Sequence, residues 1–222
     1  MQQKLFLLPG FGENEKCFRN LKPFLKEFNL VDVDYRRSLE QMKLWETNPQ
    51  KLAELLINQY KIKPTDKLVG HSMGGYFAHN VSILQGNSIC LINSFTDTDK
   101  IVRFTNSQFI NHFVTGTGLL KTSFMRNYIQ SRNKDIRMRK EMLMVQKNFK
   151  SFTNDAMLKM SILSFGADLP PANILPLHLH ALDDRVVRKP DHDFIKVRGG
   201  HFSAVFHPDE VYEKMESWLN LG

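Results

Sequence analysis

The sequence predicts an α/β fold, with a mainly parallel sheet of about six strands and helices on both of its faces. Short β-rich runs alternate with helical stretches along the 222 residues, a pattern typical of such sheets. The chain is 42% hydrophobic, which suffices for a sizeable core in one domain. The expected strands are Lys4–Leu8, Asn29–Tyr35, Asp66–Val69, Ser88–Ile92, Pro176–Ala181 and Asp193–Arg198.

Two stretches between and after these strands have apolar residues at helical spacing. The first stripe consists of Leu52, Leu55, Leu56 and Tyr60, and the second of Val211, Met215, Trp218 and Leu219. Pro208-Asp209-Glu210 opens the second stripe, as a helix start does. Right-handed crossovers between parallel strands would distribute these helices over both faces of the sheet.

Residues 95–165 break the alternation of strands and helices. They hold eight of the 17 Phe and six of the ten Met, at helical periodicity and with few β-branched runs. A segment of this length between two strands exceeds what one crossover needs. We therefore expect a helical cap at 95–165, inserted into a core formed by residues 1–94 and 166–222.

The positive charge of the chain is concentrated in that segment. The formal net charge is +7, and Lys121 to Lys150 alone contain nine Lys or Arg against Asp135 and Glu141, a difference equal to the whole excess. Such a patch attracts nucleic acid, anionic lipid or an anionic substrate, although a solvated helix face is the simpler interpretation. We expect no nucleic-acid partner, because no binding motif accompanies the patch.

The remaining bulk features indicate a cytoplasmic protein. Cys17 and Cys90 are far apart and lack a partner motif, which fits a reducing compartment. The sequence contains no run of about 18 apolar residues, so we expect no membrane span. The apolar stretch at Leu5–Leu8 is short and has no small-residue cleavage site after it, so we interpret it as a first strand.

The strongest chemical signal is the run Gly70-His71-Ser72-Met73-Gly74-Gly75. It matches G-x-S-x-G, follows a strand and precedes a helix expected from Met73 to about Gln85. A serine on so sharp a turn needs a strained backbone and small neighbours that let strand and helix approach closely. The alternative, a glycine-rich turn with an idle serine, does not account for the strand–helix context. Ser72 is the candidate nucleophile.

The run Pro9-Gly10-Phe11-Gly12 directly follows the first strand. Backbone at this place passes close to the nucleophile, where an N–H stabilises the oxyanion of acyl transfer. The candidate donors are the amides of Phe11 and Met73.

A serine nucleophile needs a base, and the base needs a carboxylate that fixes its tautomer. His201 follows the Gly199-Gly200 pair after the last strand, and Asp183 and Asp184 follow the strand before it. All these residues lie at the carboxyl ends of expected strands, where open α/β sheets place their sites. Two alternatives remain open. His207, which precedes Pro208 at an expected helix start, could be the base, and Asp97 or Asp99, which follow the strand Ser88–Ile92, could be the acid.

With the order Ser, Asp, His, the chain resembles the α/β-hydrolase family from Leu5 to about Leu221. The resemblance implies Asp184 as the acid, because the family acid comes three residues after the second residue of a strand-ending pair, here His180-Ala181. It also implies the Phe11 and Met73 amides as the oxyanion hole. The departures are Pro9 where the family has His, Ala181 where it has Gly, no strands before the first, and a loop between the last two strands in place of a helix.

These features predict a serine hydrolase that cleaves a carboxylic ester or related acyl substrate through a Ser72–His201–Asp184 triad, without a metal or organic cofactor. The partner would be a small acyl molecule, and the basic cap leaves an anionic one open. Its binding residues are expected among His71, Phe109, His112 and Phe113. His178 and His180 share one face of a strand, but without a third ligand they are interpreted as structural.

Three other functions remain open on this fold. The first is hydrolysis of thioesters of coenzyme A or a carrier protein. The second is a lyase or acyltransferase reaction, since fold does not fix reaction. The third is a non-catalytic ligand-binding protein, which the presence of all three triad residues disfavours.

Overall fold

The computed structural model describes residues 3–102, 107–132, 134–165 and 175–221. One six-stranded sheet runs through it in the order β2-β1-β3-β4-β5-β6, and every neighbouring pair is parallel. The strands are β1 (Lys4–Leu8), β2 (Asn29–Asp32), β3 (Lys67–His71), β4 (Ser88–Ile92), β5 (Leu177–Ala181) and β6 (Ile195–Val197). The prediction of a parallel sheet of about six strands is confirmed.

The two edge strands are shorter than expected. β2 ends at Asp32 instead of Tyr35, and β6 covers Ile195–Val197 within the expected Asp193–Arg198. Each edge strand has a neighbour on one side only, so its ends are the first part of the sheet to lose regular pairing. The Val33 amide still donates to the Leu7 carbonyl at 3.0 Å, after which the chain turns into α1 (Arg36–Gln41).

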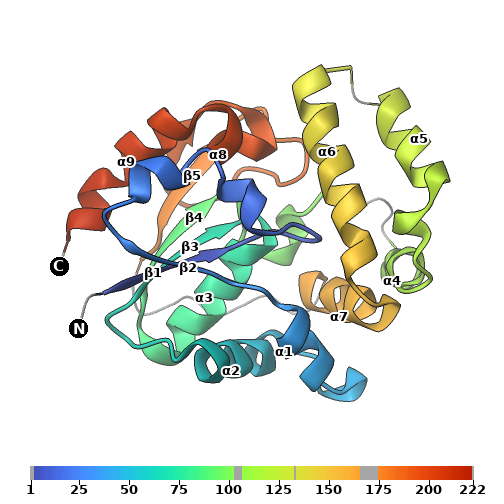
Figure 1. Ribbon diagram of the computed structural model, residues 1–222, viewed down its shortest axis with the longest axis horizontal. Coiled ribbons are helices and arrows are strands. Elements are labelled where there is room, and N and C mark those ends of the chain that lie inside the picture. The colour runs from blue at the N-terminus through green and yellow to red at the C-terminus, as the bar shows by residue number, and fades with distance from the viewer. Residues whose placement is uncertain (1–2, 103–106, 133, 166–174, 222) are drawn as a thin grey trace.

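Helices cover both faces of the sheet (Figure 1). α1, α2 (Pro49–Tyr60) and α3 (Met73–Gln85) lie on one face, and α8 (Ser203–Phe206) and α9 (Pro208–Asn220) lie on the other. β1 is buried on both sides, so Phe6 and Leu8 belong to one apolar cluster while Leu5 and Leu7 belong to the other. Both predicted helical stripes supply buried residues to these clusters.

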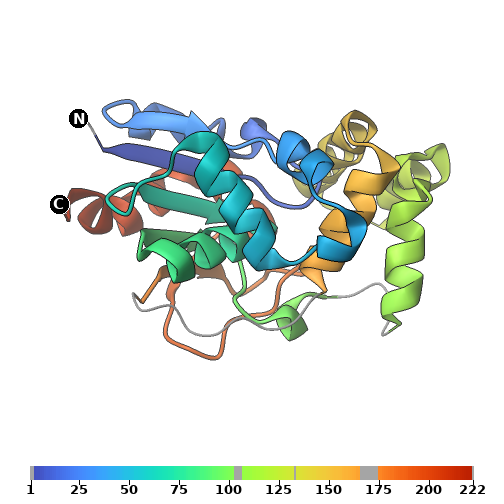
Figure 2. The same ribbon diagram turned by 90° about the horizontal axis from the view of Figure 1, so that it is seen from below.

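Among the described residues, four further α-helices lie between β4 and β5 in the chain. They are α4 (Gln108–Gly116), α5 (Ser123–Arg132), α6 (Ile136–Asn148) and α7 (Asn154–Ser164). Both views place them together at one end of the sheet (Figures 1 and 2). Met157 and Met160 of α7 are fully buried in the same cluster as Phe6, so α7 extends the main core. Residues 166–174, where the expected second part of the core begins, lie outside the described residues.

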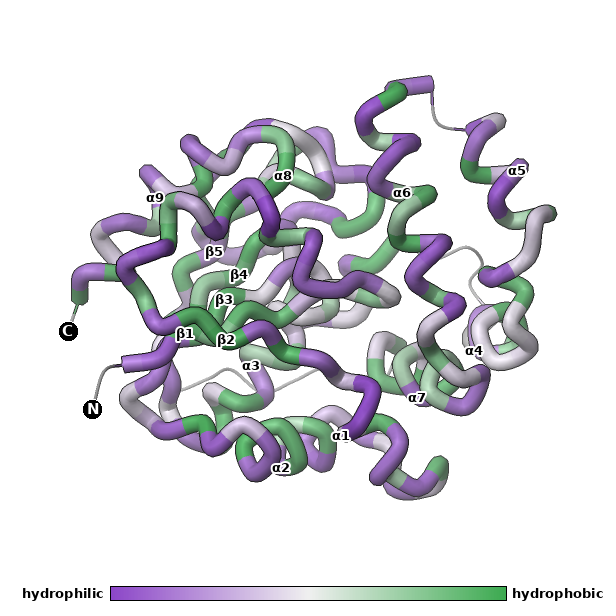
Figure 3. Tube along the Cα trace, viewed as in Figure 1, coloured by the Kyte–Doolittle hydropathy of each residue, from purple (hydrophilic) through white to green (hydrophobic). Residues whose placement is uncertain are grey.

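Two helices of this segment are more hydrophilic than the central strands. Figure 3 shows the central strands as hydrophobic, whereas α5 and α6 carry long hydrophilic stretches. No described helix combines the length and apolar character that crossing a membrane requires. Residues 182–194, between β5 and β6, contain no helix, in agreement with the expected loop.

Candidate active site

Ser72 lies at the turn between β3 and α3, in a backbone conformation that side chains rarely adopt. Its φ is 51° and its ψ is −126°, a conformation that costs on the order of 1–3 kcal/mol and persists only when the surroundings hold it. The Ser72 amide donates to the Ile92 carbonyl at 3.1 Å, and the Ser72 carbonyl accepts from the Gly75 amide and the Ser94 hydroxyl at 3.0 and 2.6 Å. The strand–turn–helix context expected for the nucleophile is therefore present.

Two glycines allow the chain to approach this turn closely. A Cβ on Gly74 would overlap the Leu8 carbonyl, and a Cβ on Gly10 would lie 3.0 Å from the Ser72 Cβ. The loop after β1 consequently lies directly against the candidate nucleophile. Phe11 of that loop and Met73, the first residue of α3, line the same cavity as Ser72.

His201 and Asp184 come together from the loops after β6 and β5. The His201 Nδ1 lies 2.8 Å from the Asp184 Oδ2, and the side chains are 6% and 0% exposed. Asp184 Oδ1 also accepts from the Val186 and Val187 amides at 2.7 and 3.0 Å. Burial alone raises the pKa of Asp184, but His201 and these amides outweigh it and hold the pKa below its usual value. Asp184 is therefore a charged, oriented partner of the imidazole.

The alternative acids and base have other contacts. Asp183 accepts from the Gly200 amide at 3.2 Å, so it supports the loop backbone. Asp97 accepts from the Asp99 amide and caps the 3₁₀ helix Thr98–Lys100. His207 stands at the N-terminus of α9. Among the described interactions, Asp184 is the carboxylate that contacts the His201 ring.

A cavity of about 360 Å³ opens beside Ser72 and His201. Its wall is mostly apolar, and α4, α5 and α6 contribute much of it. The apolar lining residues include Phe95, Ile101, Val114, Leu120, Met125, Ile129, Met142, Val145, Phe149, Phe165, Val186 and Val187. A site of this size suits an apolar small molecule.

The expected binding residues lie elsewhere. His71 is 2% exposed and buried beneath the turn. Phe109 and Phe113 are 76% and 59% exposed and stack on each other, and His112 bonds to the Ser161 hydroxyl at 2.9 Å. None of the four is among the described residues that line the cavity.

Phe109 and Phe113 lie outside the cavity because of the way α4 is turned about its own axis. This helix presents Asn111, Val114 and Thr115 to the cavity, at the spacing of one helix face. Phe109 and Phe113 belong to a different face, which points to solvent. The hydrophobicity of α4 alone does not indicate which of its faces is turned inward.

Glu13 and Asn93 are site residues that the sequence analysis missed. Asn93, at φ 46°, donates to the Gly200 carbonyl and the Ser203 hydroxyl at 2.9 and 2.6 Å and accepts from the Ala181 amide at 2.8 Å. It thus ties the loop of the candidate base to β5. The signal available in the sequence was the polar pair Asn93-Ser94 directly after the apolar strand.

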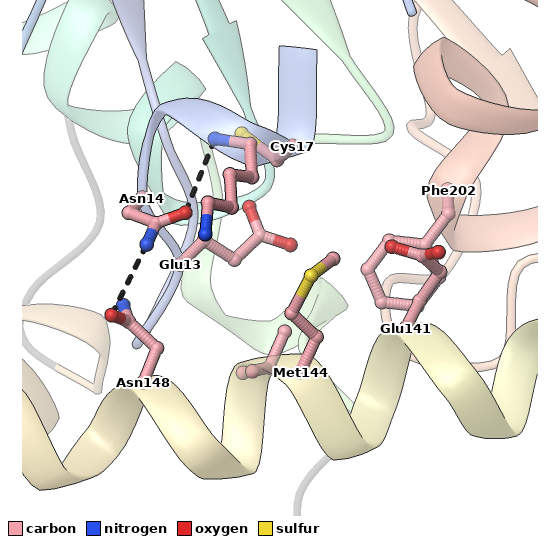
Figure 4. Close-up of a pocket in the computed structure, with 9 residues that line it drawn as sticks. Glu13, Asn14, Cys17, Glu141, Met144, Asn148 and Phe202 are labelled. Atoms are coloured by element: carbon pink, nitrogen blue, oxygen red, sulfur yellow. Dashed lines mark hydrogen bonds between the residues drawn. The ribbon is translucent and has the colours of Figure 1, made fainter. Parts of the chain in front are cut away.

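Glu13 lies in the loop after β1, beside α6 (Figure 4). Its Oε2 accepts from the Gly10 amide at 2.7 Å and lies 2.7 Å from the His71 Nδ1. The side-chain atoms of Glu13, Cys17 and His71 that could coordinate a metal ion lie within 4.8 Å of one another. His71 Nε2 lies 2.7 Å from the His201 carbonyl oxygen, so both ring nitrogens already have hydrogen-bond partners. We therefore interpret the cluster as hydrogen-bonded rather than metal-binding.

The histidines of β5 form a second buried group. His178 Nδ1 lies 2.9 Å from the His192 Nε2, and burial together with the neighbouring histidines lowers the pKa of His178 to about 3. The His178 ring is therefore neutral near pH 7, as a structural histidine would be.

No protein-family model and no curated protein matches the sequence. Solved structures do match. A hydrolase from Oleispira antarctica has a TM-score of 0.78 at 13% identity, covering 100% of this chain and 92% of that chain. An enol-lactonase from Burkholderia xenovorans LB400 has 0.72 at 13%, covering 99% and 92%. An esterase from Exiguobacterium antarcticum has 0.70 at 15%, covering 98% and 91%.

At these identities the likeness concerns the fold. It extends over nearly the whole length of both chains. Together with the six parallel strands and the turn at Ser72, it shows that this chain has the α/β-hydrolase fold.

Proposed function

We propose that the protein is a serine hydrolase that cleaves a carboxylic ester or a related acyl substrate. The observation that carries the proposal is the strained Ser72 at the wall of an apolar cavity that His201 also lines, with His201 bonded to a buried Asp184 carboxylate. A strained residue in a cleft beside an oriented base is the arrangement that activates a serine.

The reaction proposed has two halves. Ser72 Oγ attacks the carbonyl carbon while His201 Nε2 accepts the hydroxyl proton, and Asp184 stabilises the imidazolium. The tetrahedral oxyanion accepts hydrogen bonds from the Phe11 and Met73 amides, the second of which opens α3, where the first N–H groups have no partner in the helix. His201 then protonates the leaving alcohol, and water releases the acid by the same steps.

The cavity supports an apolar acyl group as substrate. Each buried methylene contributes about 0.8 kcal/mol, so each added carbon should raise kcat/KM about fourfold until the cavity is filled. The test combines labelling by a fluorophosphonate probe with hydrolysis of a series of straight-chain p-nitrophenyl esters. A flat series, or absence of both labelling and hydrolysis, would contradict the proposal.

One substitution sharpens that test. Met125 lines the cavity, so the larger side chain of Met125→Trp would fill part of it and should move the preference toward shorter acyl chains. Phe124→Trp on the same helix changes a side chain that is 67% exposed and should leave the series as it is in the wild type. An equal shift in both variants would mean that the cavity does not hold the acyl chain.

A second candidate function is hydrolysis of coenzyme A or carrier-protein thioesters, and the cations of α5 and α6 favour it. Arg126, Arg132, Arg137, Lys140 and Lys147 are exposed on the two helices whose other faces line the cavity. Charges so placed would attract a phosphate-bearing substrate toward the site. Lys121 instead donates to the Phe152 carbonyl and Asn154, within the helical segment.

If the substrate carries phosphates, kcat/KM for an acyl-coenzyme A should fall as salt rises, because the screening length shrinks from about 10 Å at 0.1 M to about 3 Å at 1 M. A matched neutral ester should respond little. Changing Arg137, Arg139 and Lys140 to Gln should remove the salt dependence, whereas changing exposed Lys26, Lys189 and Lys196 to Gln removes the same charge and should not. A thioester preference insensitive to salt and to both variants would assign the cations to the ordinary surface.

Two other functions on this fold can be distinguished from hydrolysis by simple experiments. A lyase or acyltransferase would give products other than the free acid, which product analysis detects. A ligand-binding protein without catalysis would bind the esters but would not be labelled at Ser72.

A further inference from the structure

We propose that Glu13 and His71 are positioning residues, which hold the oxyanion loop (Pro9-Gly10-Phe11-Gly12) and the backbone of His201 in one fixed relation to Ser72. This rests on the proposed hydrolase function. The two residues come from different places: Glu13 from the loop after β1, and His71 from the end of β3, directly before the nucleophile. Their side chains are 6% and 2% exposed and meet at 2.7 Å.

The hydrogen bonds of this pair reach both halves of the site. On one side, Glu13 Oε2 accepts from the amide of Gly10, the residue before the candidate oxyanion donor Phe11. On the other side, His71 Nε2 lies 2.7 Å from the carbonyl oxygen of His201. A continuous chain of hydrogen bonds therefore joins the oxyanion loop to the base through the residue that precedes Ser72.

With an ionised Glu13, the two contacts of the ring fit a doubly protonated His71. One ring nitrogen faces a carboxylate and the other faces a backbone carbonyl, and both of these groups accept hydrogen bonds. A neutral imidazole has a single N–H and would lose one of the two bonds. Only the imidazolium donates to both sides at once.

The electrostatic surroundings agree with an ion pair. Burial lowers the pKa of His71, but the charge and hydrogen bond of Glu13 outweigh it and raise the pKa above its usual value. Burial likewise raises the pKa of Glu13, and His71 reverses this so that the net direction is down. Glu13 and His71 are thus charged together over a window between their two pKa values.

Among the described residues, four other titratable groups lie around this pair. Burial, Cys17 and Glu13 raise the pKa of Tyr35 well above its usual value, so it stays neutral. Cys17, in the 3₁₀ helix Glu15–Phe18, stays a neutral thiol, because burial and Glu13 raise its pKa well above the usual value. The His201 ring is centred 4.8 Å from the His71 ring. Asp184 lies beyond it and adds to the rise in the His71 pKa. Rising pH therefore removes the proton of His71 and one bond of the chain, while falling pH protonates Glu13.

The test uses three variants of the whole chain. Glu13→Ala should lower kcat for the best ester about a hundredfold with KM within about threefold, as expected when reacting groups are misplaced by about 1 Å. Glu13→Gln should recover part of this loss, because its side-chain oxygen can still accept a hydrogen bond from the Gly10 amide. Glu15→Gln, a change at an exposed glutamate two residues away, should match the wild type.

The pH profile separates positioning from a merely structural role. In the wild type, kcat should decline at alkaline pH as His71 loses its proton. In Glu13→Gln this decline should move to lower pH, because the carboxylate charge that raises the pKa of His71 is gone. Wild-type kcat in Glu13→Ala, or the same alkaline decline in Glu13→Gln and the wild type, would overturn the proposal.

Two measurements made without substrate keep this test independent of the proposed hydrolase function. Nitrogen-15 NMR of labelled histidines should show His71, assigned with a His71→Gln variant, as imidazolium at pH 7 in the wild type and neutral in Glu13→Gln. The Gly10 amide should exchange with solvent faster in Glu13→Ala. A neutral wild-type ring or unchanged exchange would overturn the positioning role even in an active enzyme, whereas absence of labelling and hydrolysis would overturn the hydrolase function itself.

Discussion

Replacing Ser72 with Ala should abolish covalent labelling by a fluorophosphonate and lower kcat by about a millionfold, the loss typical of a triad without its nucleophile. Alanine removes only the Oγ, so the turn and its backbone hydrogen bonds stay in place. The measurement is probe labelling of the intact protein followed by kcat for the best ester. Ser131→Ala, at an exposed serine of α5, is the matched control and should behave as the wild type.

Undiminished turnover in Ser72→Ala would remove the central claim, because the reaction would then not need the Ser72 hydroxyl. Labelling that persists while turnover disappears would show that the probe reacts elsewhere. Mass spectrometry of the labelled peptide distinguishes these cases.

Asp184→Asn should lower kcat by roughly four orders of magnitude. The amide presents a donor where His201 Nδ1 needs an acceptor, which favours the wrong imidazole tautomer. Because the pKa of Asp184 is held below its usual value, the carboxylate stays charged as pH falls into the mildly acidic range.

The neighbouring aspartate provides the control. Asp183→Asn keeps a side-chain oxygen for the Gly200 amide and should cost far less. The reverse ranking of the two variants would assign the acid to Asp183 and leave the rest of the mechanism standing.

The sequence predicted the fold well because its signals were local. An apolar run ended by glycines defined β3, and the expected helix start at Met73 agrees with the structure because the same turn contains Ser72. Ser88–Ile92 agrees to the residue, since it is a short apolar run buried on both sides. At β2 and β6 the pattern overestimated the strands, because composition does not report where edge pairing ends.

The candidate site could be predicted from the sequence only in part. The sequence placed Ser72, His201 and Asp184 at strand ends, and the geometry of Asp184 and His201 agrees with the assigned pairing. His71, Phe109 and Phe113 were expected to bind substrate, but burial and helix rotation decide such roles, and neither can be read from residue type. Glu13 was missed because its importance comes from a partner 58 residues away.

The shortness of β2 and β6 affects the tendency of the protein to aggregate. An edge strand offers unpaired N–H and C=O groups that another chain can extend into an aggregate. Here both edges are brief, and Asp32 and Lys196 place exposed charges on them. The most apolar strands, β1, β3 and β4, lie in the interior of the sheet with neighbours on both sides. The strand order thus keeps the segments most prone to self-association away from the places where self-association would begin.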